Sequence, residues 1–173
     1  MGKISVDAFL REYGVVTKQK GTAMENFIKK HIVTDYVSFL EKEVTCTNIV
    51  NSTTRIIEEN REILKINSSA RYLLFVMRLI DIYTDIEIDF TDAKYVYQYD
   101  DLNKVGAIDN LIAAIPEREY SEFSTLLNMK LDDFRDNEYS ITALLYNLKQ
   151  SFSLSEEVIN SVIDELQKQA KEE

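Results

Sequence analysis

Residues 71–90, RYLLFVMRLIDIYTDIEIDF, are the most apolar passage of the chain and constrain its fold more than any other feature. From residue 71 to residue 85 the charged side chains stand at offsets 0, 7, 10 and 14. At about 100° per residue, these offsets fall within an arc of roughly 80° on a helical wheel. The pattern therefore predicts a helix that is buried over a broad face and carries one charged seam. The seam consists of Arg71, Arg78, Asp81 and Asp85.

This stretch does not have the length of a membrane span. Its uninterrupted apolar run covers residues 72–77, whereas a helix needs about 20 apolar residues to cross a bilayer. The stretch is therefore predicted to be a central core helix, followed by a change of period after Asp85.

Helix-breaking residues are scarce, which limits the fold class. The chain has one proline and four glycines in 173 residues, and 45% of its residues are hydrophobic. A many-stranded sandwich needs turn residues at short intervals, so the composition favours long helices. We expect a mainly α single domain over residues 1–173, a compact bundle of about six helices. The segments 5–13 and 154–170 are the candidates for peripheral terminal helices.

Capping residues and apolar spacing place the individual helices. Gly14 is expected to end the first one, and Thr22 with Glu25 forms a capping-box pattern before residues 23–32. Thr34 or Asp35 is expected to cap a third helix that runs to Ile49. The side chains predicted to face inward from this third helix are Tyr36, Phe39, Leu40 and Val44.

The third helix is expected to break at NSTT, residues 51–54. The following RIIEENREILKIN can form a short hairpin, an extended connector or a strained helix. Asn67, Ser68 or Ser69 then caps the central helix. A further helix is predicted from residue 100 or 101 to residue 115, and another after Pro116. Two more are predicted at 141–152 and 154–170.

Alternation after the central helix predicts a small β-hairpin near residues 86–99. Ile86, Ile88 and Phe90 alternate with acidic residues, and three tyrosines then recur at every second position. In a strand these tyrosines, Tyr95, Tyr97 and Tyr99, would share one face. Irregular structure is the alternative.

The charge of the chain limits its partners. The formal net charge is −10, and residues 117–173 carry 6 basic and 13 acidic side chains. Binding to a phosphate backbone or to an anionic membrane surface needs clustered Lys and Arg, so neither is expected. A basic protein partner would suit this charge, although solubility alone also explains it.

No motif commits the chain to a reaction. An EF-hand loop that started at Asp85 would need Gly at its sixth position and Glu at its twelfth, where Phe90 and Val96 stand. One cysteine, Cys46, and one histidine, His31, exclude an internal disulfide and a multi-histidine metal site. There is no phosphate-binding or dinucleotide-binding glycine motif, and the first ten residues lack the apolar run of a signal peptide. We expect no enzyme activity, no cofactor and no metal.

Amphipathic aromatic residues beside acidic ones are typical of protein interfaces. We therefore predict partner contacts at two places, although packing and a solvated acidic face explain the same residues. The predicted contact residues are Tyr95, Tyr97, Tyr99 and Asp100, and Asp132, Asp133 and Asp136 on the polar face of the helix that follows Pro116.

Three passages between residues 27 and 134 resemble small uncharacterised proteins of tailed bacteriophages of Gram-positive hosts. They are FIKKHIVTDYVSFLEKE, INSSARYLLFVMRLIDIYTDIEI and YDDLNKVGAIDNLIAAIPEREYSEFSTLLNMKLDDF. The resemblance implies a viral protein from the virion structural and assembly genes, such as a tail assembly chaperone or a head–tail component. It carries over no functional residue.

We therefore expect a non-catalytic protein that acts through protein–protein contacts, in the host cytoplasm or the virion. Its partners would be other phage or host proteins, or further copies of itself in a homo-oligomer. The alternative is a small acidic inhibitor or adaptor that binds the basic groove of a nucleic-acid enzyme. A carboxylate metal enzyme ranks third.

Overall fold

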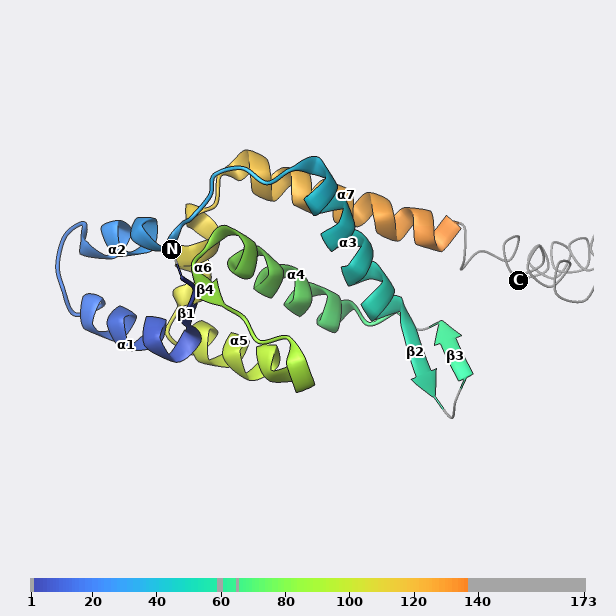
Figure 1. Ribbon diagram of the computed structural model, residues 1–173, viewed down its shortest axis with the longest axis horizontal. Coiled ribbons are helices and arrows are strands. Elements are labelled where there is room, and N and C mark those ends of the chain that lie inside the picture. The colour runs from blue at the N-terminus through green and yellow to red at the C-terminus, as the bar shows by residue number, and fades with distance from the viewer. Residues whose placement is uncertain (1, 59–60, 65, 137–173) are drawn as a thin grey trace, which may run out of the picture. The chain divides into compact units, whose positions relative to one another are not determined.

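The computed structural model describes residues 2–58, 61–64 and 66–136, with the backbone alone at 55–58 and 61–64. The chain divides into two compact units, 1–130 and 131–173, and the second is described over 131–136. The predicted mainly α class is confirmed (Figure 1). The elements in these ranges are β1 (Ile4–Ser5), α1 (Val6–Val16), α2 (Ala23–His31), α3 (Phe39–Thr54), β2 (Arg55–Glu58), β3 (Arg61–Leu64), α4 (Ser68–Tyr83), β4 (Ile86–Glu87), the 3-10 turn η1 (Thr91–Ala93), α5 (Lys94–Lys104), α6 (Ala107–Ala114) and α7 (Glu117–Phe134).

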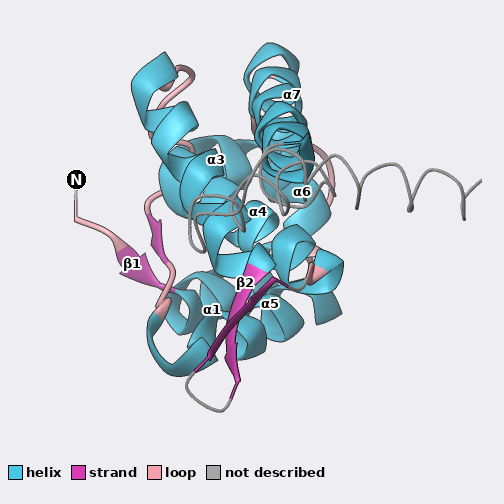
Figure 2. Cartoon of the chain, turned by 90° about the vertical axis from the view of Figure 1, so that its right-hand side faces the viewer, coloured by secondary structure: helices cyan, strands magenta, loops and turns pink. Residues whose placement is uncertain are grey.

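Helix α4 is the central helix that the apolar stretch predicts. Asn67 caps it, because its side-chain oxygen accepts a hydrogen bond from Ala70 N–H at 3.0 Å. The charged seam is present only in part. Arg78 lies 3.8 Å from Asp81 and stacks over the Phe90 ring, but Asp85 lies after the end of α4 and is buried beside His31. Helices α5 and α6 pack along one side of α4, α1 lies against α5 and β4, and α3 crosses on the other side of α4 (Figures 1 and 2).

The main core lies between α4 and the helices α1, α2, α5 and α6. Helix α1 belongs to this core, although its predicted counterpart was a candidate for a peripheral place. The buried residues of the core are Val6, Phe9, Tyr13, Phe27, Ile28, Val76, Met77, Ile80, Ile86, Ile88, Leu102, Ala107, Ile108 and Leu111.

A second set of buried side chains joins α3, α4 and α7. The ring of Tyr83 at the end of α4 lies 6.2 Å from the ring of Phe123 on α7, and Phe75 lies 5.9 Å from Tyr120. Cys46 on α3 is fully buried, and its Sγ lies 3.6 Å from the carbonyl oxygen of Phe123. These contacts place α3 and the first part of α7 on the side of α4 away from α1.

The strands are short. Strand β1 pairs in parallel with β4, through Ile4 with Ile86 and Ser5 with Glu87. Strands β2 and β3 form an antiparallel hairpin, which was one of the three alternatives for the stretch after NSTT. Neither pair builds a layer of the fold.

Three predicted boundaries are wrong for local reasons. Helix α1 continues through Gly14 to Val16, since Gly14 has a helical backbone and needs no positive φ. Helix α3 does not break at residues 51–54. The hydroxyls of Ser52, Thr53 and Thr54 donate to carbonyl oxygens four residues earlier in the same helix, an arrangement that the helix accommodates. Gly106, with a φ of 71°, divides the predicted helix 100–115 into α5 and α6.

The predicted hairpin near residues 86–99 is wrong. Its first part is the two-residue strand β4, and its tyrosines belong to helix α5. Tyr95 and Tyr99 are one helical turn apart, and both pack partly against the core. The three alternating tyrosines therefore lie on a helix, where Tyr95 and Tyr99 form an i, i+4 pair and Tyr97 between them is exposed. The predicted segments 141–152 and 154–170 lie outside the described residues.

A candidate protein-interaction surface on helix α3

The first turns of α3 expose four large apolar side chains. They are Tyr36 just before the helix and Phe39, Leu40 and Val44 within it; Leu40 is 70% exposed. All four were predicted to face inward, and that prediction is wrong. We refer to these four residues as the α3 apolar surface. Clustered apolar exposure of this kind marks binding surfaces far more often than isolated apolar residues do.

A lysine occupies the inward side of the same turns. Lys42 has no exposed surface, and Cys46, Ile49, Val50 and Thr53 continue the buried face at helical spacing. Helix α3 is therefore rotated so that it buries a cation and presents phenylalanine and leucine to solvent. Such an orientation needs a strong partner for the cation, because an unpaired buried charge is very costly.

Two carboxylates of α7 supply that partner. The Nζ of Lys42 lies 2.9 Å from Glu119 Oε2 and 2.6 Å from Glu122 Oε2. The side chain of Glu119 is 4% exposed, whereas that of Glu122 is 39% exposed. The buried pair is therefore Lys42 with Glu119, and Glu122 connects it to solvent.

Glu119 also accepts two further hydrogen bonds at the same oxygen. The hydroxyl of Tyr83 donates at 2.6 Å and the backbone N–H of Val37 donates at 2.9 Å. One carboxylate thus joins α4, α7 and the segment that leads into α3. Because the Val37 N–H is held, the exposed Tyr36 and Phe39 project from a fixed backbone rather than from a free loop.

The pKa values in this cluster follow from these contacts. Burial opposes ionisation of Glu119, but hydrogen bonds from Tyr83, Lys42 and Val37 outweigh it and lower the pKa of the carboxyl. Burial likewise opposes the charge of Lys42, and the contacts with Glu122 and Glu119 outweigh it and raise the pKa of its ammonium group. Burial and the adjacent Glu119 raise the pKa of Tyr83. The cluster is therefore an ion pair with a neutral phenol as donor.

The start of α3 has its own caps. Ser38 Oγ accepts the N–H of Glu41 at 3.3 Å, so Ser38 caps the helix in place of the predicted Thr34 or Asp35. Thr34 is used earlier, in a turn where its hydroxyl donates to the Tyr36 carbonyl at 2.7 Å. These bonds and the Val37 contact together define where the α3 apolar surface begins.

The predicted contact residues Tyr95, Tyr97, Tyr99 and Asp100 lie on α5, where their side chains point in different directions. Tyr95 packs against Phe90 with ring centroids 5.6 Å apart, and Tyr99 packs against Tyr72 at 6.3 Å. Tyr97 is exposed, as is Asp100. These residues do not form the single aromatic face that a strand would have given, and Tyr97 stands alone.

The predicted acidic residues on α7 are exposed. Asp132, Asp133 and Asp136 all face solvent, and Asp132 lies 3.8 Å from Arg135 one turn away. They belong to the second unit. Partner binding there remains a prediction.

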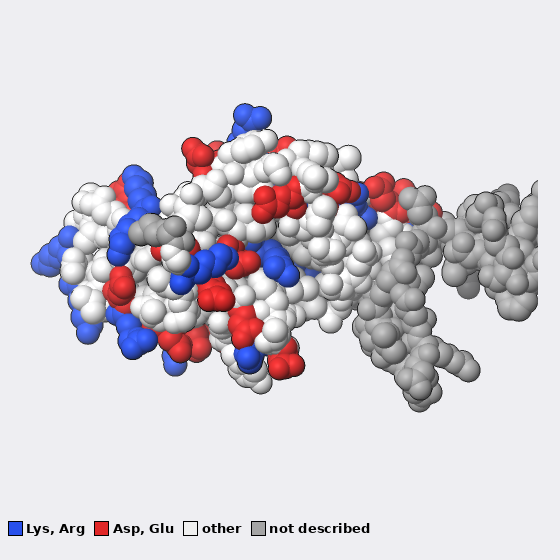
Figure 3. Space-filling view, viewed as in Figure 1, with Lys and Arg blue, Asp and Glu red and all other residues white. Residues whose placement is uncertain are grey.

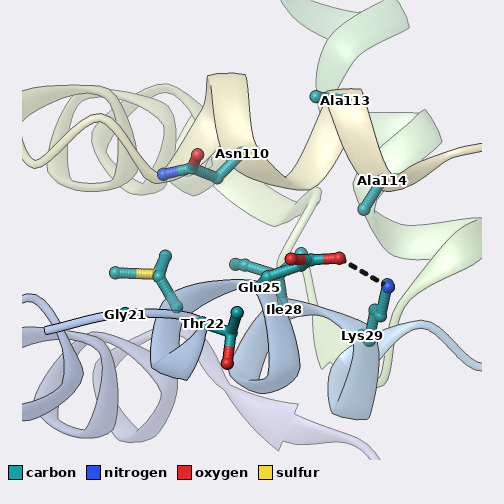
Figure 4. Close-up of a pocket in the computed structure, with 9 residues that line it drawn as sticks. Gly21, Thr22, Glu25, Ile28, Lys29, Asn110, Ala113 and Ala114 are labelled. Atoms are coloured by element: carbon teal, nitrogen blue, oxygen red, sulfur yellow. Dashed lines mark hydrogen bonds and ion pairs between the residues drawn. The ribbon is translucent and has the colours of Figure 1, made fainter. Parts of the chain in front are cut away.

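A cleft lies between α2 and α6 (Figure 4). Its volume is about 500 Å³, and its lining includes Met24, Ile28 and the small side chains Ala113 and Ala114. The charged pair on its edge, Lys29 with Glu25 at 2.7 Å, lies within one helix and is largely exposed.

The single histidine contacts an aspartate inside the protein. His31 Nδ1 lies 2.8 Å from Asp85 Oδ1, and both side chains are buried. The imidazole packs edge to face against Phe9 and Phe27, with ring centroids 5.1 and 4.6 Å away. The ring itself is 2% exposed. The pair ties the end of α2 to the segment after α4.

Three further features of the described residues concern a thiol, metal ligands and membrane helices. Burial raises the pKa of the Cys46 thiol to about 11, so it is a poor nucleophile. Over residues 2–58, 61–64 and 66–136, no three His, Cys, Asp or Glu side chains gather where they could hold a metal ion. Within the same ranges no helix has both the length and the apolar character for crossing a membrane.

Comparisons with known proteins identify no relative of this chain. No protein-family model, no curated protein and no solved structure matches the chain. The described residues define a mainly α protein whose most distinctive surface is apolar and held in place by a buried ion pair.

Sequence reasoning missed both Lys42 and Glu119. A signal for each was present, since Lys42 stands four and seven residues before Cys46 and Ile49, and Glu119 stands four and seven before Phe123 and Leu126. Each charge therefore lies on the apolar stripe of its own helix. Two opposite charges on two such stripes are a sign of a buried pair.

Proposed function

We propose that this chain is a non-catalytic protein that works through protein–protein contacts, with the α3 apolar surface as its principal contact. The observation that carries the proposal is the exposure of Phe39 and Leu40 on a helix whose buried side holds a lysine. Exposed apolar side chains reduce solubility, and a helix that buried them would not need the Lys42 pair. A partner that covered Phe39 and Leu40 would remove this apolar surface from water, which explains why the chain alone exposes it.

The fixed backbone supports the same proposal. A surface that is already ordered loses little conformational entropy when a partner binds. The hydrogen bond from Val37 to Glu119 and the Ser38 cap order the segment from Tyr36 to Leu40 before any contact is made.

The resemblance to tailed-phage proteins gives the biological setting of the proposal. The protein would be a structural or assembly component of a virion, such as a tail assembly chaperone or a head–tail component. Its partners would be other phage or host proteins, in the host cytoplasm or the virion. The α3 apolar surface fits this role better than that of an inhibitor in a basic groove, because such a groove calls for carboxylates rather than for four apolar side chains.

Site-specific photo-crosslinking tests the proposal. A photoreactive phenylalanine analogue at position 40 should crosslink a discrete partner in cells that produce the protein with its native neighbours. The same analogue at position 97 is the matched control, since Tyr97 is equally exposed but lies on α5. Crosslinking from position 97 with none from position 40 would contradict the proposal.

A further inference from the structure

We infer that the α3 apolar surface receives a basic amphipathic segment of a partner protein, with apolar side chains on Leu40 and its neighbours and with Lys or Arg beside Asp35 and Glu41. This inference rests on the proposed function and adds the chemistry of the partner. It follows from the charges around the surface, the shape of the surface and the charge distribution of the rest of the first unit.

The exposed charges nearest to the surface in sequence are acidic. Between residues 33 and 48 the charged side chains are Asp35, Glu41, Lys42 and Glu43, and the first two are exposed. Lys42 is buried, and its charge is balanced by Glu119 and Glu122. Glu43 is half-buried and pairs with Lys130. A partner therefore meets apolar side chains bordered by two free carboxylates.

The neighbouring turn of α7 adds no net positive charge beside the acidic Asp35 and Glu41. Glu117 and Arg118 are both exposed there and offset each other. Lys and Arg gather instead over the far end of the unit, around α1 and α2, whereas the surface over α3 and α7 is mainly white with several red groups and few blue ones (Figure 3). A basic segment would thus be attracted to the α3 side and repelled from the α1–α2 end.

The dimensions of the surface suit one face of a helix. Leu40 and Val44 are one turn apart, Phe39 lies beside them and Tyr36 extends the strip before the helix. At about 1.5 Å per residue the strip is roughly 8 Å long within α3, enough for two or three apolar side chains at i, i+3 or i+4 spacing. An interface of this size gives a weak, transient complex.

A second copy of the chain is a less suitable occupant. In a symmetric dimer through this surface, Asp35 and Glu41 of one copy would approach the same carboxylates of the other, in a chain whose net charge is −10. A head-to-tail contact with the basic α1–α2 end avoids that repulsion and is tested below.

The test uses two synthetic probes and the full-length chain. One probe is an amphipathic Leu/Lys peptide of about 14 residues, four helical turns, and the other is its Leu/Glu analogue. Binding is measured by fluorescence anisotropy. The surface variants are Leu40→Ser, Val44→Ser and the pair Asp35→Asn with Glu41→Gln. The matched controls on α5 are Tyr97→Ser and the pair Asp100→Asn with Asp101→Asn, and circular dichroism checks the fold of each variant.

The Leu/Lys peptide should bind with one-to-one stoichiometry and the Leu/Glu peptide should not. Loss of Leu40 or Val44 should weaken binding about tenfold each, because each buries an aliphatic side chain in the complex. Loss of the two carboxylates should weaken binding about tenfold at about 0.05 M salt and much less at about 0.5 M salt. The α5 controls should bind like the unmodified chain.

Three results would overturn the inference. If the apolar variants weaken binding and the carboxylate variants do not, the proposed function stands but the basic partner does not. If neither set weakens binding, or if the α5 controls weaken it as much, both fail. If sedimentation velocity shows self-association that Leu40→Ser abolishes, a second copy is the occupant.

Discussion

Replacing Lys42 with methionine tests whether the buried ion pair determines the orientation of α3. Methionine keeps most of the side-chain volume, so the change removes a charge without opening a large cavity. Lys42 Nζ lies 2.9 Å from Glu119 Oε2 and 2.6 Å from Glu122 Oε2. Glu122 is partly exposed and can regain water, whereas Glu119 cannot. The cost of the change therefore lies almost wholly at Glu119.

The magnitude follows from what Glu119 retains. Removing one partner of a buried ion pair typically costs about 3–5 kcal/mol. We expect a loss of about 3 kcal/mol, the lower end of that range, because Tyr83 and Val37 still donate to the carboxylate. Combining Lys42→Met with Glu119→Gln removes the unpaired charge, so the loss should fall to about 1 kcal/mol, the worth of one hydrogen bond.

Urea denaturation followed by circular dichroism at pH 7 measures these free energies of unfolding. Lys29→Met is the matched control, because Lys29 forms an exposed pair with Glu25 and its loss should change stability far less. The reasoning is refuted if Lys42→Met costs less than about 1 kcal/mol. It is equally refuted if the double variant is less stable than Lys42→Met alone.

The pH dependence gives a second measurement on the same variant. The pKa of Glu119 in the folded chain is below its ordinary value of 4.5. Its ionised form therefore stabilises the folded state above pH 4.5, and that contribution is lost as the pH falls through the lowered pKa. Without Lys42 the pKa of Glu119 rises. The stability difference between the two chains should accordingly be largest near neutral pH and shrink in acid.

Two further predictions concern local structure. Asn67→Ala should lower the free energy of unfolding by about 1 kcal/mol because it removes the α4 cap, whereas Thr22→Ala should have little effect because the Thr22 hydroxyl makes no cap hydrogen bond; equal losses in urea denaturation would contradict this. Gly14→Ala should raise the free energy of unfolding by about 0.5–1 kcal/mol and Gly106→Ala should lower it by about 1 kcal/mol, since only Gly106 has a positive φ; thermal melts that shift in the same direction would refute the assignment.

Much of the helical framework could be predicted from the sequence, because it depends on local properties. The spacing of charges on residues 71–85 is enough to place α4 in the core, and Pro116 marks the start of α7. Boundaries were less predictable. Residues 51–54 have the composition of a turn, yet they remain in α3, where the three hydroxyls bond to the preceding turn of the helix. Gly106 interrupts the composition of the predicted helix, but one glycine does not show whether a helix ends there, and its positive φ divides α5 from α6.

The candidate site was less predictable than the framework. The tyrosines at 95, 97 and 99 fit a strand and a helix equally well over five positions, and packing of Tyr95 and Tyr99 against Phe90 and Tyr72 decides for the helix. The acidic turn at residues 132–136 was correctly predicted to be exposed, since nothing on that face is apolar.

The buried face of helix α3 could not be predicted from its local sequence. Its sequence offers two apolar faces, one with Phe39, Leu40 and Val44 and one with Cys46, Ile49 and Val50. The sequence by itself determined that a helix would form and that either face could be buried. The tertiary structure decided which, because Glu119 arrives from α7, 77 positions after Lys42, and makes the burial of a lysine favourable. A charge can enter a core only where its partner already lies, and that partner is set by the packing of distant helices.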